Sequence, residues 1–213
     1  MLKLSIVPVT QYQQNCSIVY DDQTKVGVVV DPGGDVEIIA AAVKELGVTI
    51  QAVWLTHGHL DHAGGAEAAK SEFGVQIVGP QEADKMLLDN IETVAAGYGM
   101  SGMFNATPDQ WLNEGDNVSV GEHEFEVRHC PGHAPGHVVF INHANKLILM
   151  GDVLFRGSIG RTDLPGGDHQ QLLDSIAKKI MTLDDDYQFI SGHSEPSTIG
   201  AERKSNPYVQ QLA

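Results

Sequence analysis

The stretch Thr56-His57-Gly58-His59-Leu60-Asp61-His62, directly behind the apolar run of residues 52–55, holds four possible metal ligands within six residues. Side chains two residues apart in an extended strand point to the same side, so we expect His57 and His59 to face one hollow. Asp61 and His62 come where the apolar spacing of residues 63–73 begins to predict a helix. The stretch therefore predicts two pairs of ligands around one site.

The ligand types narrow the choice of metal. Imidazole and carboxylate groups suit zinc, iron or manganese, and the lack of thiolates argues against a closed, Cys-rich structural zinc site. The alternative is a polar strand-to-helix turn whose histidines are merely solvated. Four ligand-type side chains packed so closely favour the metal site.

The acidic composition limits the possible partners. A formal net charge of −15 over 213 residues disfavours nonspecific attraction to nucleic-acid phosphates or to anionic lipids. No apolar run approaches the length of a membrane span, and the first residues resemble a strand rather than a secretion signal. Cys16 and Cys130 are too few for a disulfide framework and fit a reducing compartment. We expect a cytoplasmic monomer or small homo-oligomer with no nucleic-acid or membrane partner.

The order of the predicted elements indicates one α/β domain over residues 1–213, a length at which a hydrophobic content of 42% can fill one core. Residues 4–9, 16–20 and 26–30 predict a meander of three strands. A helix capped by Asp35 and ended by Gly47 follows, and then the strand through Val53 and the helix after His62. This alternation is typical of a layered α/β architecture.

The second half of the chain repeats this order. Strands are predicted at residues 75–78, 111–116, 117–120, 124–127, 138–141, 147–150 and 188–190, with helices at 81–88 and 170–181, the latter capped by Asp168. Glycines and a proline interrupt residues 90–109, which we interpret as a mobile connection. Four of its residues either cover a bound substrate or anchor the loop on the core: Tyr98, Met100, Met103 and Phe104.

Several further motifs follow in the order that one known family requires. They are Cys130-Pro131-Gly132-His133, Pro135-Gly136-His137, Met150-Gly151-Asp152 and Gly192-His193. Together with His57-x-His59-x-Asp61-His62, they resemble the signature of the metallo-β-lactamase-fold superfamily. This resemblance implies a four-layer αββα sandwich of two mixed β-sheets with helices on the outer faces.

The resemblance also implies a binuclear metal site. One cation position is formed by His57, His59 and His133, and the other by Asp61, His62 and His193. Asp152 is the implied bridge, while His137 lies outside the ligand set. Two cations about 3.5–4 Å apart can share a water, lower its pKa and polarise a carbonyl oxygen, so a metal-bridged hydroxide is the expected nucleophile. Zinc is the first choice for both cations, with iron or manganese as alternatives.

The identity of residue 152 narrows the reaction. The β-lactamase branch places a cysteine there, whereas Asp152 is similar to glyoxalase II, a thioester hydrolase that releases an acid and glutathione. Residues 151–163, Ser197-Thr198-Ile199-Gly200 and Glu202-Arg203-x-x-Asn206-Pro207 resemble the small bacterial glyoxalase II-like group. The implied substrate is a small thioester such as S-lactoylglutathione.

Recognition of glutathione is less directly indicated. Full-length glyoxalase II carries a C-terminal helical domain that contacts glutathione, and we expect none here. Arg161 stands where a cationic contact to the substrate carboxylate is expected. A structural ion pair with Asp163 explains Arg161 equally well, because both charges sit in one Gly-rich loop.

Three other functions remain open. A persulfide dioxygenase would need one iron, held by His57, His133 and Asp152. A non-catalytic metal-binding scaffold is the second alternative, and the complete ligand set argues against it. Phosphodiesterase activity on RNA is the third, disfavoured by the charge. A thiol mechanism through Cys130 is less favoured than a buried thiol, because nothing nearby in the sequence lowers its pKa.

Overall fold

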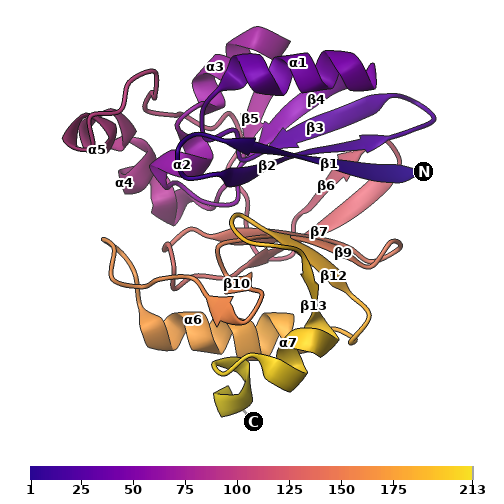
Figure 1. The fold of residues 1–213 in the computed structure, drawn as a ribbon, viewed down its shortest axis with the longest axis vertical. Coiled ribbons are helices and arrows are strands. Elements are labelled where there is room, and N and C mark those ends of the chain that lie inside the picture. The colour runs from indigo at the N-terminus through magenta and orange to yellow at the C-terminus, as the bar shows by residue number, and fades with distance from the viewer. Residues whose placement is uncertain (213) are drawn as a thin grey trace.

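Two mixed β-sheets pack face to face, with helices on both outer surfaces (Figure 1). The computed structural model describes residues 1–212. The first half of the chain forms the upper sheet of Figure 1 and its helices, and the second half forms the lower sheet and its helices. The predicted αββα sandwich is confirmed.

The first sheet has five strands in the order β1-β2-β3-β4-β5. Their bounds are Leu2–Val9, Gln14–Asp21, Val26–Val30, Thr49–Trp54 and Gln76–Val78. Strands β1, β2 and β3 form the predicted antiparallel meander, whereas β3, β4 and β5 run parallel. The carboxyl ends of β3 and β4 therefore meet at one edge, where Asp31 and the His57 stretch follow them.

The second sheet has the order β13-β12-β9-β8-β7-β6. In chain order its strands are Asn117–Val120, His123–His129, Val138–Asn142, Leu147–Gly151, Gln188–Ser191 and Ser197–Thr198. Only β9 and β12 pair in parallel, so both strands end on the same side of the sheet. A small separate hairpin, β10 (Leu154–Phe155) with β11 (Ser158–Ile159), follows β9.

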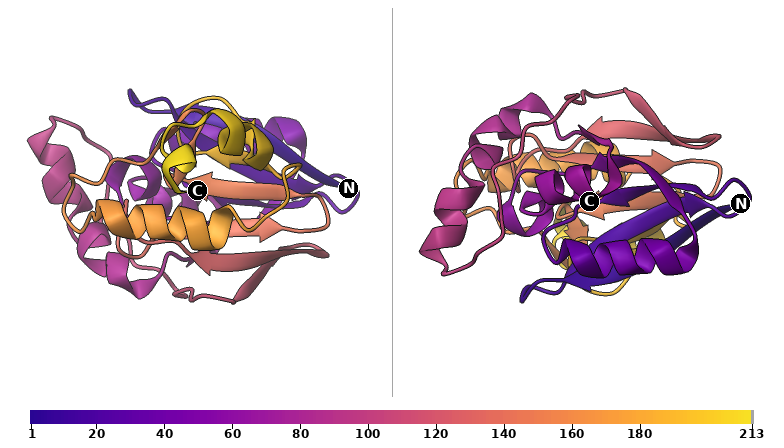
Figure 2. Two further views of the ribbon diagram at one scale, coloured as in Figure 1. Left: turned by 90° about the horizontal axis from the view of Figure 1, so that it is seen from below. Right: turned by 90° about the horizontal axis from the view of Figure 1, so that it is seen from above.

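Helices cover the outer faces of both sheets. Figure 2 shows α1 (Val36–Leu46) across the first sheet and α6 (His169–Ser175) with α7 (Ile199–Ser205) across the second. The remaining helical segments are α2 (Leu60–Ala63), α3 (Ala66–Phe73), η1 (Glu82–Asp84), α4 (Lys85–Leu88), α5 (Ile91–Gly97), η2 (Ile176–Ile180) and η3 (Val209–Leu212). Among the described residues, no helix combines the length and the apolar character of a membrane-crossing segment.

The alternation of side chains along the strands builds the layers. Val28 and Val30 of β3 face the second sheet, while Val29 between them packs under α1. Trp54 at the end of β4 lies between the sheets, stacked on Phe140 at a centroid distance of 4.9 Å and edge-on to Phe125 at 5.4 Å. Such aromatic packing adds to the stabilisation from burial alone.

Three local predictions were wrong. Asp35 is not a side-chain cap, because it adopts a left-handed conformation and its carboxylate accepts from the Thr10 amide instead. Residues 111–116 form no strand: Gly115 has a positive φ and the Asp116 carboxylate accepts from the Asn113 amide, which closes a turn. The segment 90–109 is not irregular throughout, since residues 91–97 form α5.

Other predicted ends are confirmed. The Asp168 carboxylate accepts from the Gln171 amide at 2.9 Å, and Gly47 ends α1 with φ 64°. The predicted helix after His62 is divided into α2 and α3 at Gly64 and Gly65. The Gly65 amide donates to the carbonyl of Pro32, so this break fits α2 against the turn after β3.

Replacing Trp54 with alanine should lower the free energy of unfolding by about 3–5 kcal/mol, because it opens a cavity between the sheets. Urea denaturation followed by circular dichroism would measure the change. Phe104→Ala is the control, since that side chain is 48% exposed and its loss should cost less than about 0.5 kcal/mol. Equal effects of the two substitutions would contradict a core centred on Trp54.

Candidate metal centre

The first ligand cluster joins three histidines from the two halves of the chain. His57 and His59 follow β4, and His133 lies in the loop between β7 and β8. His133 Nε2 lies 3.2 Å from His57 Nε2 and 2.9 Å from His59 Nδ1. Nitrogen lone pairs at such distances repel one another unless a proton or a cation lies between them. The cluster therefore has the ligand type and spacing of a cation site.

Hydrogen bonds on the far sides of the rings fix which nitrogens face inward. His133 Nδ1–H donates to the carbonyl of Arg161 at 2.7 Å. His57 Nδ1–H donates to the Thr56 hydroxyl at 3.0 Å, and that hydroxyl donates to Asp31 at 2.6 Å. With the protons on Nδ1, both Nε2 atoms present lone pairs to the cluster. This is the orientation that a metal ligand needs.

The second cluster consists of Asp61, His62 and His193. Helix α2 carries the first two, and His193 follows β12. His193 Nε2 lies 3.1 Å from Asp61 Oδ2, and His62 Nε2 lies 3.9 Å from the same oxygen. His62 Nδ1–H donates to Asp31 at 2.9 Å, so Nε2 presents a lone pair when the ring is neutral.

Asp152, which follows β9, lies between the clusters. Its Oδ2 is 3.6 Å from His133 Nε2 and 3.7 Å from His193 Nε2, and its Oδ1 is 3.4 Å from His62 Nε2. One carboxylate thus contacts both groups of ligands. This is the place that a bridging residue would occupy.

Unpartnered buried atoms test whether cations fit here. Asp152 Oδ1, His62 Nε2 and His59 Nε2 are buried without a hydrogen-bond partner among the described residues. Each such atom costs about 1–3 kcal/mol unless something binds it. Asp152 Oδ1 and His62 Nε2, which lie 3.4 Å apart, face the space between the clusters, where a divalent cation would bind both. The nitrogen and oxygen donors suit zinc, iron or manganese.

Burial and neighbouring charges set the protonation of the ligands. Burial lowers the pKa of His57 well below its usual value, that of His59 to about 3, and that of His133 as well. For Asp152, burial alone would raise the pKa, but the His62 and His133 rings outweigh it and hold the pKa far below the usual value. The centre therefore combines neutral imidazoles with an ionised carboxylate, the forms that bind metals.

His62 and His193 differ from the other ring ligands. Burial alone would lower the pKa of each. For His62 the Asp152 and Asp61 carboxylates outweigh burial, and for His193 the hydrogen bond to Asp61 and the Asp152 charge do, so that both pKa values are raised. In the absence of cations, protons on these rings offset the charge of the two carboxylates.

Asp31 is a site residue that the sequence reasoning missed. Its buried carboxylate accepts from the Thr56 amide at 2.7 Å, from the Thr56 hydroxyl and from His62. It thereby orients one histidine of each cluster, His62 directly and His57 through Thr56. Its place at the end of β3, before Pro32-Gly33-Gly34, resembles an ordinary turn, and only the left-handed φ of 52° marks it as special.

His137 lies outside both clusters, as predicted. Its ring stacks on His57 at a centroid distance of 4.6 Å. His137 Nε2 accepts from the Asp152 amide at 2.9 Å. The His137 ring therefore supports His57 by stacking on it, and supports Asp152 by a hydrogen bond to the Asp152 backbone amide.

Arg161 forms the predicted structural ion pair with Asp163. Its guanidinium makes two bonds of 2.7 Å to Asp163, and both side chains are more than half exposed. The two residues line a hollow of about 330 Å³ together with His169 and Tyr208. Contact with a substrate stays a prediction, because an exposed pair of this kind can exchange partners.

The C-terminal motif Glu202–Asn206 holds the hairpin that leads from Asp152 to Arg161. The side-chain NH₂ group of Asn206 donates to the carbonyls of Phe155 and Ser158 and to the carboxylate of Glu202. Glu202 in turn accepts from the Gly157 amide at 2.7 Å. These bonds fix β10 and β11, and with them the carbonyl that orients His133.

Cys130 is buried and unpaired with another cysteine, as expected. Burial raises the pKa of its thiol to about 12, so the thiolate is scarcely populated at neutral pH. The structure therefore gives no support to a thiol mechanism.

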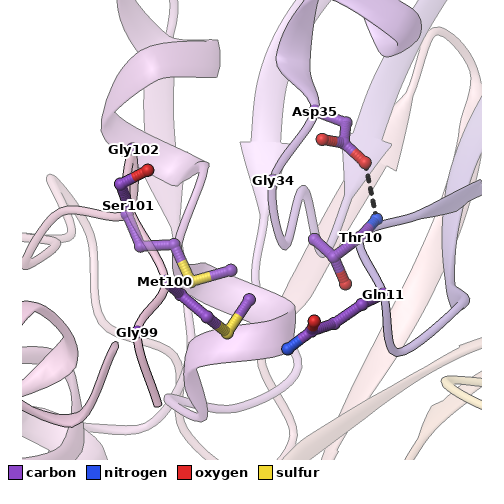
Figure 3. A pocket seen from close by; sticks show the side chains of 9 residues that line it. Thr10, Gln11, Gly34, Asp35, Gly99, Met100, Ser101 and Gly102 are labelled. Atoms are coloured by element: carbon purple, nitrogen blue, oxygen red, sulfur yellow. Dashed lines mark hydrogen bonds between the residues drawn. The ribbon is translucent and has the colours of Figure 1, made fainter. Parts of the chain in front are cut away.

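The segment predicted to cover a substrate is partly an anchor. Met103 is buried against α3 and α5, and Met100 is partly buried there, whereas Tyr98 and Phe104 are exposed. Figure 3 shows Met100 across a hollow of about 230 Å³ from Thr10 and Gln11. Met103 thus acts as a core anchor, and the exposed rings do not.

Comparisons with known proteins agree with this arrangement. The model of the Metallo-beta-lactamase superfamily matches residues 9–193. The chain is 44% identical over 209 residues to hydroxyacylglutathione hydrolase GloC of Haemophilus influenzae, covering 98% of both chains. Its structure is similar to that of BLEG-1 B3 metallo-beta-lactamase, with a TM-score of 0.89, 34% identity and coverage of 97% of this chain and 99% of that chain. For TTHA1623 in a di-iron-bound form, the TM-score is 0.87 and the identity 31%, over 96% and 99% of the two chains. The chain belongs to the metallo-β-lactamase superfamily.

Proposed function

We propose that the protein is a binuclear metallohydrolase that cleaves a small thioester such as S-lactoylglutathione. The observation that carries the proposal is the meeting of two ligand clusters at one carboxylate, Asp152. The 44% identity to a protein named hydroxyacylglutathione hydrolase supports the choice of substrate class. The di-iron form of TTHA1623 supports two metal ions and makes iron a candidate beside zinc and manganese.

In the proposed centre, His57, His59 and His133 hold one cation and Asp61, His62 and His193 hold the other, with Asp152 between them. When bound, such a pair of cations supplies an activated water and polarises the thioester carbonyl. Asp61 engages His193 through Oδ2, which leaves Oδ1 able to accept a hydrogen bond from the attacking water and orient it. Asp31 and the Arg161 carbonyl keep the ring protons away from the centre.

A second candidate function is hydrolysis of β-lactams, which is suggested by the structural similarity to BLEG-1 B3 metallo-beta-lactamase. Both reactions attack an acyl carbonyl, so the same centre suits either. The aspartate at position 152 and the higher identity to the thioester hydrolase favour the thioester.

The decisive experiment compares substrates on protein purified without added metal. We expect thioester cleavage of S-lactoylglutathione, with two equivalents of zinc, iron or manganese per chain by elemental analysis. Faster hydrolysis of ampicillin would favour the β-lactamase. Oxygen consumption with glutathione persulfide and a single iron would favour the dioxygenase. No turnover of any of these by metal-replete protein would favour the scaffold.

Asp152→Ala should lower kcat for the preferred substrate by at least about 10³-fold, because the residue contacts both clusters. Metal content should fall from two equivalents to one or less. Elemental analysis and initial rates would measure both effects. Asp174→Ala is the control, since this surface carboxylate pairs with Lys178 and Gln170. Full activity of Asp152→Ala would rule out the proposed bridge.

Arg161→Ala should raise KM about tenfold and change kcat less than about twofold, if the guanidinium leaves Asp163 to bind a substrate carboxylate. Steady-state kinetics with S-lactoylglutathione would measure both constants. Arg156, an exposed arginine in the same hairpin, provides the matched control Arg156→Ala. An unchanged KM in Arg161→Ala would leave the residue with its ion pair alone.

Acid should destabilise the metal-free protein. Four buried histidines have lowered pKa values, namely His57, His59, His133 and His137. The folded state keeps them neutral while the unfolded state takes up protons below about pH 6.5, so stability is lost as the pH falls through that value. The raised pKa values of His62 and His193 change the stability mainly above pH 6.5. Burial raises the pKa of the Asp84 carboxyl to about 6, so its protonation in the folded state opposes the loss of stability only below pH 6.

We therefore expect the Tm of the protein in chelator to fall between pH 7 and pH 5.5. Differential scanning calorimetry would measure it. A Tm that stays constant or rises towards pH 5.5 would contradict the lowered pKa values of the four rings.

A further inference from the structure

We propose that Asp84 is a positioning residue that holds together the two loops carrying the first histidine cluster. Nothing in the ligand motifs points to this residue, which ends the short helical turn η1 that follows β5 in the chain. The inference rests on the proposed metal centre and assigns a role to a side chain that contacts none of the reacting atoms.

The Asp84 carboxylate makes one hydrogen bond to each loop. Its Oδ2 accepts from the Gly58 amide at 2.7 Å, and its Oδ1 accepts from the Gly136 amide at 2.5 Å. Gly58 stands between His57 and His59, and Gly136 stands three residues after His133. The side chain is fully buried, so these bonds have no competition from bulk water.

Close backbone contact shows that the arrangement is tightly built. A Cβ on Gly136 would lie 2.3 Å from the carbonyl oxygen of Gln81 and 2.6 Å from the Asp84 nitrogen. A Cβ on Gly58 would lie 3.0 Å from Leu87 and 3.2 Å from the Asp84 carbonyl oxygen. Glycine at both positions lets the loops approach η1 and α4 closely enough to donate to one carboxylate.

The need for such a link follows from the histidine cluster. His57 and His59 belong to the first half of the chain and His133 to the second, yet their ring nitrogens lie 2.9–3.2 Å apart. Without a cation, repulsion between the lone pairs favours separation of the two loops. Asp84 opposes that separation, because moving either loop breaks a hydrogen bond to a buried carboxylate. Preorganisation of this kind lowers the cost of binding the cation.

The roles of Asp84 and Asp31 differ. Asp31 orients rings through His62 and Thr56, whereas Asp84 bonds only to backbone amides and sets the distance between loops. Loss of Asp84 should therefore weaken cation binding by the first histidine cluster, which both loops form. Cation binding by the second cluster, on α2 and after β12, should be nearly unaffected.

The test uses the full chain with Asp84→Asn, which keeps the shape but turns an NH₂ group towards one of the two amide donors. Zn²⁺ affinity is measured by competition with a chromophoric chelator, and exchange of the Gly58 and Gly136 amides by NMR in the metal-free protein. The control is Asp109→Asn, another carboxylate beside β5, which accepts from the Ile77 amide and from Lys70, each at 2.8 Å.

For Asp84→Asn we expect one zinc equivalent to bind about 10–100-fold more weakly, with the other changed less than threefold. Exchange of at least one of the two amides should accelerate more than tenfold, and Asp109→Asn should change neither quantity. Unchanged zinc affinity in Asp84→Asn would overturn the role of Asp84, as would equal weakening of both equivalents together with a lower Tm, which indicates general destabilisation. Failure of the wild-type chain to bind zinc, iron or manganese would overturn the metal centre and this inference with it.

Discussion

The structure depends on gathering five histidines and two aspartates at the seam between two sheets, with ring nitrogens of the first cluster only 2.9–3.2 Å apart. This arrangement is electrostatically unfavourable by itself, because buried donors and acceptors without partners cost free energy. Two kinds of support compensate for it. Hydrogen bonds outside the centre fix each ring, and close backbone contacts fix the loops. A bound cation would supply what remains and would thereby link the stability of the fold to the proposed cofactor.

Glycines make the convergence possible at three positions behind the ligands. A Cβ on Gly33 would lie 1.6 Å from the Asp61 carbonyl oxygen, one on Gly160 would lie 1.9 Å from that of Asp152, and one on Gly192 would lie 2.3 Å from Asp152 Oδ1. Each distance is too short for any side chain. Strand ends from both sheets can therefore bring their ligands to one point only because the neighbouring backbone is bare. The motif that contains His193 has a glycine at position 192 for this steric reason.

The sequence could identify the residues of the two clusters because their signal is local. Spacing in the His57 stretch and the family motifs around His133, Asp152 and His193 identify the groups that the structure brings together. Asp31 and Asp84 escaped prediction because their partners lie 25 to 52 residues away along the chain, and nothing around them distinguishes a buried carboxylate from a turn residue. Helix α5 was missed for a related reason: Ile91 and Ala95 give too short an apolar repeat, and burial against α2 decides the conformation.

The proposed substrate contact and the proposed metal centre share one piece of backbone. The segment from Asp152 to Arg161 begins with the carboxylate that contacts both clusters and ends with the carbonyl that orients His133. Glu202 and Asn206 fix its middle, so the exposed guanidinium of Arg161 projects from a rigid support. A substitution that shifts this hairpin would move the His133 ring as well as the substrate contact. The Glu202–Asn206 motif fixes this backbone and therefore supports the His133 ring and the proposed substrate contact together.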